Sequence, residues 1–270
     1  MQTCLVVSGP AQFAALAFKD SLEKGVQCVA DLGFDAVELA IRDPEQVDAS
    51  GLKTLLQKLG LPVVAIGTGQ AYGEEGLSFT DPRAEVRWAA IERVKKHIDL
   101  AAKLDAMVII GLIRGRRVDG VTQEQAVQWL LEALCQCAGH AVPQQVRLVL
   151  EPINRYETNL LNTVAETMDL IRQSGCSNIG ILYDTFHANI EEADMHRAIR
   201  EAGQLLWHVH TADSNRWAPG FGHLDFTSLV VTLRGIGYRG ALSAEILPLP
   251  DPESSARQAR EFLKKLTRSH

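Results

Sequence analysis

Short runs of apolar residues alternate along the whole chain with longer amphipathic stretches. Most of these runs are continuous rather than interrupted at every second position, which is typical of strands buried on both faces of a parallel sheet. Eight runs predict strands, at residues 3–8, 36–41, 62–68, 106–112, 146–152, 179–184, 205–212 and 241–247.

The stretches between the runs have helical periodicity and carry helix boundary signals. Leu32-Gly33 and Leu59-Gly60 end two of them as a glycine cap would, and Asp251-Pro252 starts another with an N-cap followed by proline. Helices are therefore expected at residues 21–32, 50–59, 82–103, 122–138, 163–174, 194–202, 227–236 and 252–267.

This strict alternation of strand and helix predicts an α/β fold. The 270 residues divide into eight units of about 34, a length that suits one strand-and-helix repeat. An open doubly wound sheet is the alternative, but the chain has no G-x-G-x-x-G dinucleotide motif. Eight complete units favour a single (β/α)8 barrel, with residues 1–270 forming one domain.

Ionisable residues stand at the ends of the last four predicted strands. Glu151, Asp184, His210 and Glu245 follow one another at intervals of about one repeat. The carboxyl ends of barrel strands share one face, which is where such barrels bind ligands. Three carboxylates gathered there repel one another unless a cation neutralises them. One imidazole with three carboxylates predicts a divalent metal site, for which Mn²⁺ is favoured and Mg²⁺ or Co²⁺ are alternatives.

The loops after these strands carry further polar groups, which would form a hydrogen-bonding rim suited to a polyhydroxylated ligand. They include Glu157, His187 and Arg216. His208 lies two positions before His210 on the same strand face, so we interpret it as core packing or support for the metal site.

A cluster of arginines follows the fourth predicted strand. Arg114, Arg116 and Arg117 in GLIRGRR form either a solvated loop or a site for a substrate carboxylate or phosphate, which arginine binds bidentately. We expect Arg114 to contact the substrate and Gln70, after the third strand, to border the same pocket.

The strand-end quartet and the segments EPINRYETN, DTFH and ADSNRW resemble the xylose isomerase-like TIM barrels, and within them the ketose 3-epimerases of the tagatose/psicose group. The resemblance covers essentially the whole chain. It implies that Glu151, Asp184, His210 and Glu245 are metal ligands. It also implies that Glu151 and Glu245 act as the acid/base pair, and that Glu157, His187 and Arg216 hold the substrate oxygens.

The resemblance implies an isomerase that epimerises the carbon next to a ketone through a cis-enediolate. The arginine-rich loop departs from what is expected of enzymes for neutral ketoses. A keto-sugar acid is therefore the favoured substrate, with 5-keto-L-gluconate and D-tagaturonate as the pair. The alternatives are a neutral ketose of the tagatose/psicose type, or a hydroxypyruvate or sugar isomerase.

Charge and composition argue against other classes of function. The formal charge is -6, from 27 basic and 33 acidic residues, which disfavours nucleic acid and anionic membranes as partners. An endonuclease of the same superfamily needs histidine ligands from the early strands, yet the first histidine is His97, in a predicted helix. A sugar-acid-binding protein without catalysis stays open, although a complete acid/base pair disfavours it.

The sequence also bears on the cellular location and the assembly of the protein. No apolar run approaches the length of about 18 residues that a membrane span needs. The N-terminus lacks a basic leader, and the five cysteines include no C-x-x-C pair. We therefore expect a cytoplasmic protein with reduced thiols that binds a small-molecule sugar or sugar acid. The resemblance also implies a homo-oligomer, either a dimer or a tetramer.

Overall fold

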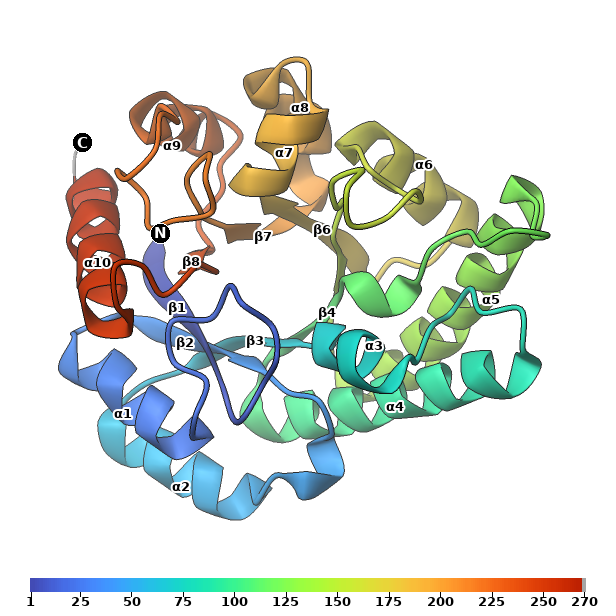
Figure 1. Cartoon of the computed structure of the whole chain (residues 1–270), viewed down its shortest axis with the longest axis horizontal. Coiled ribbons are helices and arrows are strands. Elements are labelled where there is room, and N and C mark those ends of the chain that lie inside the picture. Colours follow the sequence, from blue (N-terminus) through green and yellow to red (C-terminus); the bar gives the residue numbers. More distant parts are fainter. Residues whose placement is uncertain (269–270) are drawn as a thin grey trace.

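Eight parallel strands pair in chain order and close into a barrel, as the sequence predicts (Figure 1). The computed structural model describes residues 1–268. The strands are β1 (Gln2–Ser8), β2 (Ala36–Ala40), β3 (Val63–Gly67), β4 (Met107–Ile110), β5 (Leu148–Leu150), β6 (Ile179–Asp184), β7 (Leu206–His210) and β8 (Ala241–Ala244). β8 pairs with β1, which leaves the sheet without an open edge.

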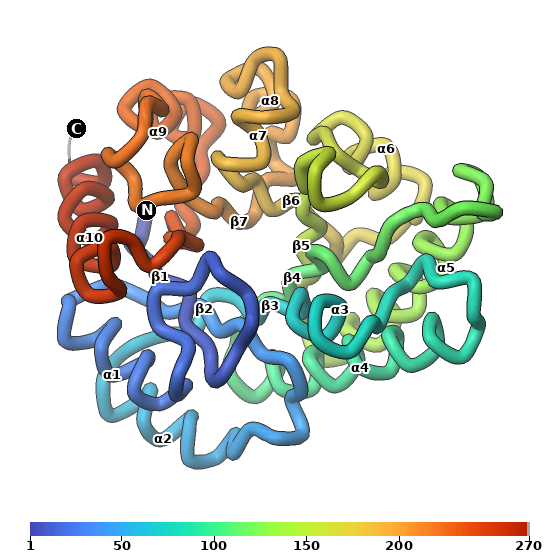
Figure 2. The backbone as a smooth tube through the Cα atoms, in the orientation of Figure 1, coloured from blue at the N-terminus to red at the C-terminus, as the bar shows by residue number. Residues whose placement is uncertain are grey.

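Eight longer helices surround the strands as an outer ring, and α10 packs beside β1 where the ring closes (Figure 2). They are α1 (Leu22–Asp31), α2 (Ala49–Leu59), α4 (Ala84–Leu104), α5 (Gln123–Ala141), α6 (Val164–Ser174), α8 (Met195–Ala202), α9 (Phe226–Gly235) and α10 (Pro252–Arg268). The sequence predicts all eight. None of the described helices is both long enough and apolar enough to cross a membrane.

Two short helices that the pattern does not predict follow β3 and β6. They are α3 (Gly69–Glu75) and α7 (Thr185–Glu191), and each begins at the carboxyl end of its strand. Four single 3₁₀ turns also occur, at Pro44–Gln46, Leu112–Arg114, Val142–Gln144 and Gly203–Leu205. Elements this short contain too few residues to display a periodicity.

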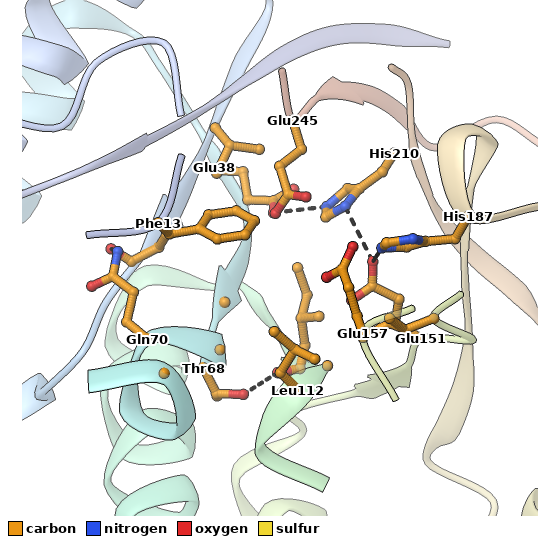
Figure 3. Close-up of a pocket in the computed structure, with 18 of the residues that line it drawn as sticks. Phe13, Glu38, Thr68, Gln70, Leu112, Glu151, Glu157, His187, His210 and Glu245 are labelled. Atoms are coloured by element: carbon orange, nitrogen blue, oxygen red, sulfur yellow. Dashed lines mark hydrogen bonds and ion pairs between the residues drawn. The ribbon is translucent and has the colours of Figure 1, made fainter. Parts of the chain in front are cut away.

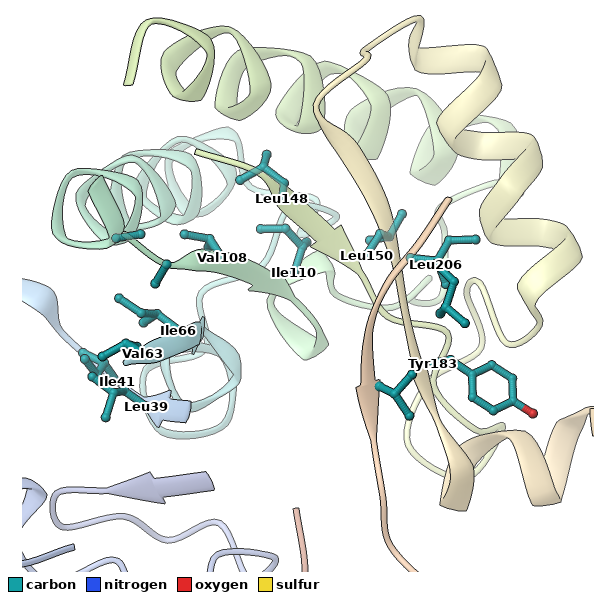
Figure 4. Packing of buried hydrophobic residues seen from close by; sticks show 14 of the residues in the cluster. Leu39, Ile41, Val63, Ile66, Val108, Ile110, Leu148, Leu150, Tyr183 and Leu206 are labelled. Atoms are coloured by element: carbon teal, nitrogen blue, oxygen red, sulfur yellow. The ribbon is translucent and has the colours of Figure 1, made fainter. Parts of the chain in front are cut away.

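Side chains alternate between the two faces of each strand. Leu39, Ile110 and Leu150 belong to the main apolar core, which fills the space between the barrel and its helices (Figure 4). A smaller apolar cluster, from the alternate positions of neighbouring strands, consists of Ala65, Met107, Ile109, Val149 and Leu182. The polar side chains of the mouth lie on this second, inward-facing set of positions.

One buried arginine joins two loops at the carboxyl end of the barrel. Arg114, in the 3₁₀ turn after β4, is 0% exposed. Its Nε and Nη2 donate to the carbonyls of Leu160 and Leu161 at 3.0–3.2 Å. Its Nη1 donates to the carbonyls of Gly111 and Glu151. Burial lowers the pKa of this guanidinium to about 10, so it is still charged at neutral pH.

These bonds correct the expectation that Arg114 contacts the substrate. All five of its N–H groups face backbone carbonyls, and Arg114 is not among the residues that line the cavity described below. Arg116 and Arg117 are exposed. The arginine therefore fixes the loops after β4 and β5 instead of binding an anion.

We expect Arg114→Ala to lower the free energy of unfolding by roughly 3–5 kcal/mol, because it leaves a buried hole and removes the guanidinium donors from four carbonyls, of which those of Gly111 and Leu161 keep a backbone donor. Chemical denaturation measures this loss. Arg116→Ala is the matched control and should leave the denaturation midpoint unchanged, since its side chain is exposed. Equal midpoints for the two variants would contradict this structural role of Arg114.

Candidate active site

The four residues predicted at the strand ends meet at one mouth of the barrel. Glu151 directly follows β5, Asp184 ends β6, His210 ends β7 and Glu245 directly follows β8. Asp184 pairs in register with His210. The barrel therefore brings these four side chains together, as the spacing of the repeats predicts.

Two facing atoms of this cluster have no hydrogen-bonding partner among the described residues. They are Asp184 Oδ2 and His210 Nδ1, both buried and 3.8 Å apart. Glu151 Oε1 lies 3.7 Å from the same His210 nitrogen. Ligand atoms of Asp184, His210 and Glu245 all lie within 4.8 Å of one another.

This geometry fits a divalent cation. Two ligand atoms on one ion at about 2.1 Å each lie at most about 4.2 Å apart. The spacings around His210 Nδ1 fall within that limit. Unpartnered buried polar atoms are costly in a folded protein, and a shared ion would satisfy both of them. The chemistry of the set, oxygen-rich with one imidazole, suits a hard or borderline metal.

The carboxylates of the cluster differ in their affinity for protons. Burial, followed by the neighbouring charges of Glu245 and Asp184, raises the pKa of Glu151 to about 8. Burial also raises the pKa of Glu245. Burial acts in the same direction on Asp184, but the neighbouring His210 imidazole and the positive charge of Arg216 outweigh it and hold the pKa of Asp184 below its usual range. The site therefore stabilises one ionised carboxylate beside two that resist ionisation.

His187, on α7, is oriented by the loop after β5. Its Nδ1 lies 2.7 Å from Asn154 Nδ2, an amide donor, so the imidazole carries its proton on Nε2. That nitrogen lies 3.8 Å from Asp184 Oδ2 and 3.9 Å from Glu151 Oε1. Burial lowers the pKa of His187 to about 4, so the ring is neutral at physiological pH. It thus presents an N–H donor to the cavity.

Arg216 links two of the acidic side chains. Its Nη1 lies 2.9 Å from Glu157 Oε1, and its Nη2 lies 3.1 Å from Glu245 Oε2. Its backbone φ is 62°, a left-handed conformation that costs a residue other than glycine of order 1 kcal/mol. The buried carboxylate of Asp213 sustains this loop by accepting hydrogen bonds from the backbone N–H groups of residues 214, 220 and 224.

The cluster opens into a cavity of about 270 Å³ (Figure 3). Gln70 lines it, as predicted, and donates from Nε2 to Ser8 Oγ at 2.6 Å. Phe13 and Glu74 also line it, and the sequence pattern predicts neither. Of the described residues that line the cavity, Arg216 carries the one guanidinium. Glu157, His187, Arg216 and Gln70 thus line the same cavity as Glu151, His210 and Glu245, whereas Arg114 does not.

Glu38, a buried carboxylate on β2 that lines the same cavity, is a further site residue that the sequence pattern does not predict. Its Oε1 lies 2.9 Å from His210 Nε2, and its Oε2 lies 2.6 Å from His208 Nε2. The available signal is a charged residue inside the apolar run AVELAI, since isolated charges in buried strands are rare. His208 is accordingly a support for the cluster, one of the two interpretations that its position allows.

Comparison with known proteins agrees with this fold. Residues 26–266 match the family described as the xylose isomerase-like TIM barrel. An L-ribulose 3-epimerase of Mesorhizobium japonicum is 34% identical over 86% of this chain and 78% of its own length. A D-psicose 3-epimerase of Agrobacterium fabrum is 33% identical over 82% of this chain and 77% of its own length.

A solved structure of L-ribulose 3-epimerase superposes with a TM-score of 0.86 at 30% identity, covering 98% of this chain and 94% of the other. This chain therefore belongs to the ketose 3-epimerase family of the xylose isomerase-like TIM barrels, a family of isomerases.

Proposed function

We propose that this protein is a metal-dependent epimerase that inverts the carbon next to the ketone of a sugar. The observation that carries this proposal is the buried cluster of three carboxylates around His210, in which Asp184 Oδ2 and His210 Nδ1 face each other without partners. Glu151 and Glu245 enter the cluster from β5 and β8. The named activities of the relatives support the same reaction class.

Glu151, Asp184, His210 and Glu245 would hold the ion. Mn²⁺ is the ion we favour, with Mg²⁺ or Co²⁺ as alternatives. When bound, a divalent cation neutralises the crowded carboxylates and acts as a Lewis acid on a ketone oxygen.

The two glutamates exchange protons with the substrate carbon. Epimerisation requires one group to remove the proton on one face and a second group to return a proton on the other face. One glutamate must therefore carry a proton while the other is ionised, and the charge of a bound ion acts on the pKa of both. The partner glutamate, in its ionised form, removes the proton. The roles exchange when the reaction runs in reverse.

The neighbouring side chains orient the reacting end of the sugar. The neutral His187 offers its Nε2–H to a substrate oxygen. Arg216, fixed between Glu157 and Glu245, offers a positive charge beside the oxygens on which negative charge develops. Phe186 stacks on its guanidinium at 4.9 Å and keeps it in place.

The other end of the cavity favours a neutral ketose as substrate. Gln12, Gln70 and Glu74 line it, and these side chains suit hydroxyl groups. The preference for a keto acid, with 5-keto-L-gluconate and D-tagaturonate as the pair, depended on the arginine-rich loop. Arg114 in that loop is committed to backbone carbonyls, and neither Arg116 nor Arg117 is among the lining residues. A carboxylate placed beside Glu74 would meet a like charge.

One observation keeps the keto acid as a second candidate. The backbone N–H of Gln12 and the guanidinium of Arg42 both contact the Glu74 carboxylate, at 2.9 and 3.1 Å. Together these two donors form an anion site at the edge of the cavity. A substrate carboxylate would bind to this site if the Glu74 side chain turned away. Whether the Glu74 carboxylate stays on these two donors therefore decides between a neutral ketose and a keto acid as the substrate.

We also propose that the protein is a cytoplasmic homo-oligomer, a dimer or a tetramer. The residues that favour an interface are large exposed hydrophobic side chains, of which Tyr156 at 82% exposure and Trp88 at 64% are the most prominent. Analytical ultracentrifugation decides the oligomeric state.

Glu151→Gln and Glu245→Gln should each reduce turnover by roughly 10³-fold, since each removes one of two proton carriers. Proton NMR in D₂O follows deuterium entry at the carbon next to the ketone, with D-tagatose, D-fructose, 5-keto-L-gluconate, D-tagaturonate and hydroxypyruvate as the panel. Glu253→Gln, an exposed change on α10, is the control. Near-native rates for Glu151→Gln with metal bound would refute the two-carboxylate model, and exchange in hydroxypyruvate alone would favour the isomerase alternative.

Removal of the ion with a chelator should abolish exchange and make the fold less stable. Mn²⁺ at one hundred times its Kd should raise the free energy of unfolding by about 2.7 kcal/mol. Thermal denaturation with and without Mn²⁺ measures this gain, and Asp184→Asn should lose it. Full activity in protein shown to be metal-free would contradict the metal site.

Glu74→Gln should raise kcat/KM for 5-keto-L-gluconate by about tenfold relative to D-tagatose, because it removes a negative charge from the cavity. Wild-type protein should turn over D-tagatose faster. Glu45→Gln is the control, since the exposed Glu45 pairs with Lys96 and is not one of the lining residues. A wild-type preference for the keto acid would instead establish the second candidate.

A further inference from the structure

We infer that Glu38 is a positioning residue that fixes the orientation and tautomer of His210, so that this histidine presents its Nδ1 lone pair to the metal. The inference rests on the metal site of the proposed function. It concerns a residue on the opposite side of the barrel from the quartet, in the first half of the chain.

Three donors converge on the Glu38 carboxylate. Its Oε1 accepts from His210 Nε2 at 2.9 Å. Its Oε2 accepts from His208 Nε2 at 2.6 Å and from Ser243 Oγ at 2.8 Å. Glu38 is 1% exposed, and both histidines are 2% exposed or less. Such a fully bonded buried carboxylate holds its partners in a single arrangement.

The direction of these bonds determines which nitrogen of His210 is free. An ionised carboxylate accepts hydrogen bonds and donates none, so Nε2 must carry a hydrogen. In the neutral ring the lone pair then lies on Nδ1. Nδ1 is the atom that faces Asp184 and Glu151 and lacks a partner among the described residues. A carboxylate behind a metal-binding imidazole fixes its orientation and raises its basicity.

The barrel makes this long reach possible. Glu38 is on β2 and His210 is on β7, and β1 and β8 lie between them. At the level of His210 the register places Ser243 on β8, Cys4 on β1 and Ala36 on β2, which are all small. The Glu38 side chain therefore crosses the interior to the histidines, and Figure 3 shows it beside His210 together with Glu245.

The trio of Glu38, His208 and His210 could instead hold a second ion, since its ligand atoms lie within 4.8 Å of one another. Its contacts of 2.6 and 2.9 Å have the lengths of charge-assisted hydrogen bonds, and Nε2 of each ring is already engaged in one. We therefore expect one ion for each chain.

The test is Glu38→Gln, measured by calorimetric titration of Mn²⁺ into chelator-treated protein. A glutamine amide accepts through its oxygen and donates through its nitrogen, so it cannot accept from both histidines on its two sides. The Kd for Mn²⁺ should rise by roughly 10–100-fold. Ser243→Ala is the matched control. It removes one hydrogen-bond donor to the Glu38 carboxylate and leaves both histidine contacts in place, so it should change the Kd for Mn²⁺ by less than about threefold.

A second measurement needs no variant. Long-range ¹⁵N–¹H NMR of the histidine rings in Mg²⁺-loaded wild-type protein should show a hydrogen on Nε2 of His210 and none on Nδ1. A hydrogen on Nδ1, an unchanged Kd in Glu38→Gln, or a second ion that this variant loses would each overturn the inference. Wild-type protein that binds no metal would refute the proposed function itself.

Discussion

Because eight parallel strands pair around a closed ring, their carboxyl ends share one narrow mouth, and every second side chain must point into a small interior. Residues separated by a full repeat in the sequence become neighbours at that mouth. The register that pairs Asp184 with His210 and His210 with Ser243 follows from this closure. Each of the last four strands contributes one or two polar groups at or near its end, which would be unremarkable alone. They can act together on a ligand because the closed barrel holds them next to one another.

The interior is divided between apolar packing and charge. One inward cluster, which includes Met107, Ile109 and Leu182, is apolar and packs like any barrel core. The other inward polar groups gather around Glu38 and the strand-end quartet. Burying these charges is costly, and hydrogen bonds from His208, His210 and Ser243 offset that cost for Glu38. The quartet has no such full set of partners, which is why its electrostatics point to a cation.

Two buried charged groups support the site without a role in binding substrate. Arg114 ties the loop after β4 to the loop after β5, and one of its acceptors is the carbonyl of Glu151. Glu38 supports His210 from across the barrel. Both are committed to partners that leave little freedom of movement. The preorganisation of a proton-transfer site depends on such supports as much as on the reacting groups.

The sequence by itself determined the alternation of strand and helix, the closed barrel and the positions of Glu151, Asp184, His210 and Glu245. Apolar periodicity and spacing from one strand end to the next are local properties of the chain, and general rules convert them into a fold and a functional face. The tertiary structure alone decided which partners the buried charges take. Arg114 has the same sequence signature as a solvated or anion-binding arginine, yet it bonds to carbonyls 46 and 47 positions away. Glu38 meets His210 across 172 positions. Hydrogen-bond partners at such separations depend on how strands are arranged around the ring and on which side chains are small enough to leave a path, and no local pattern carries that information.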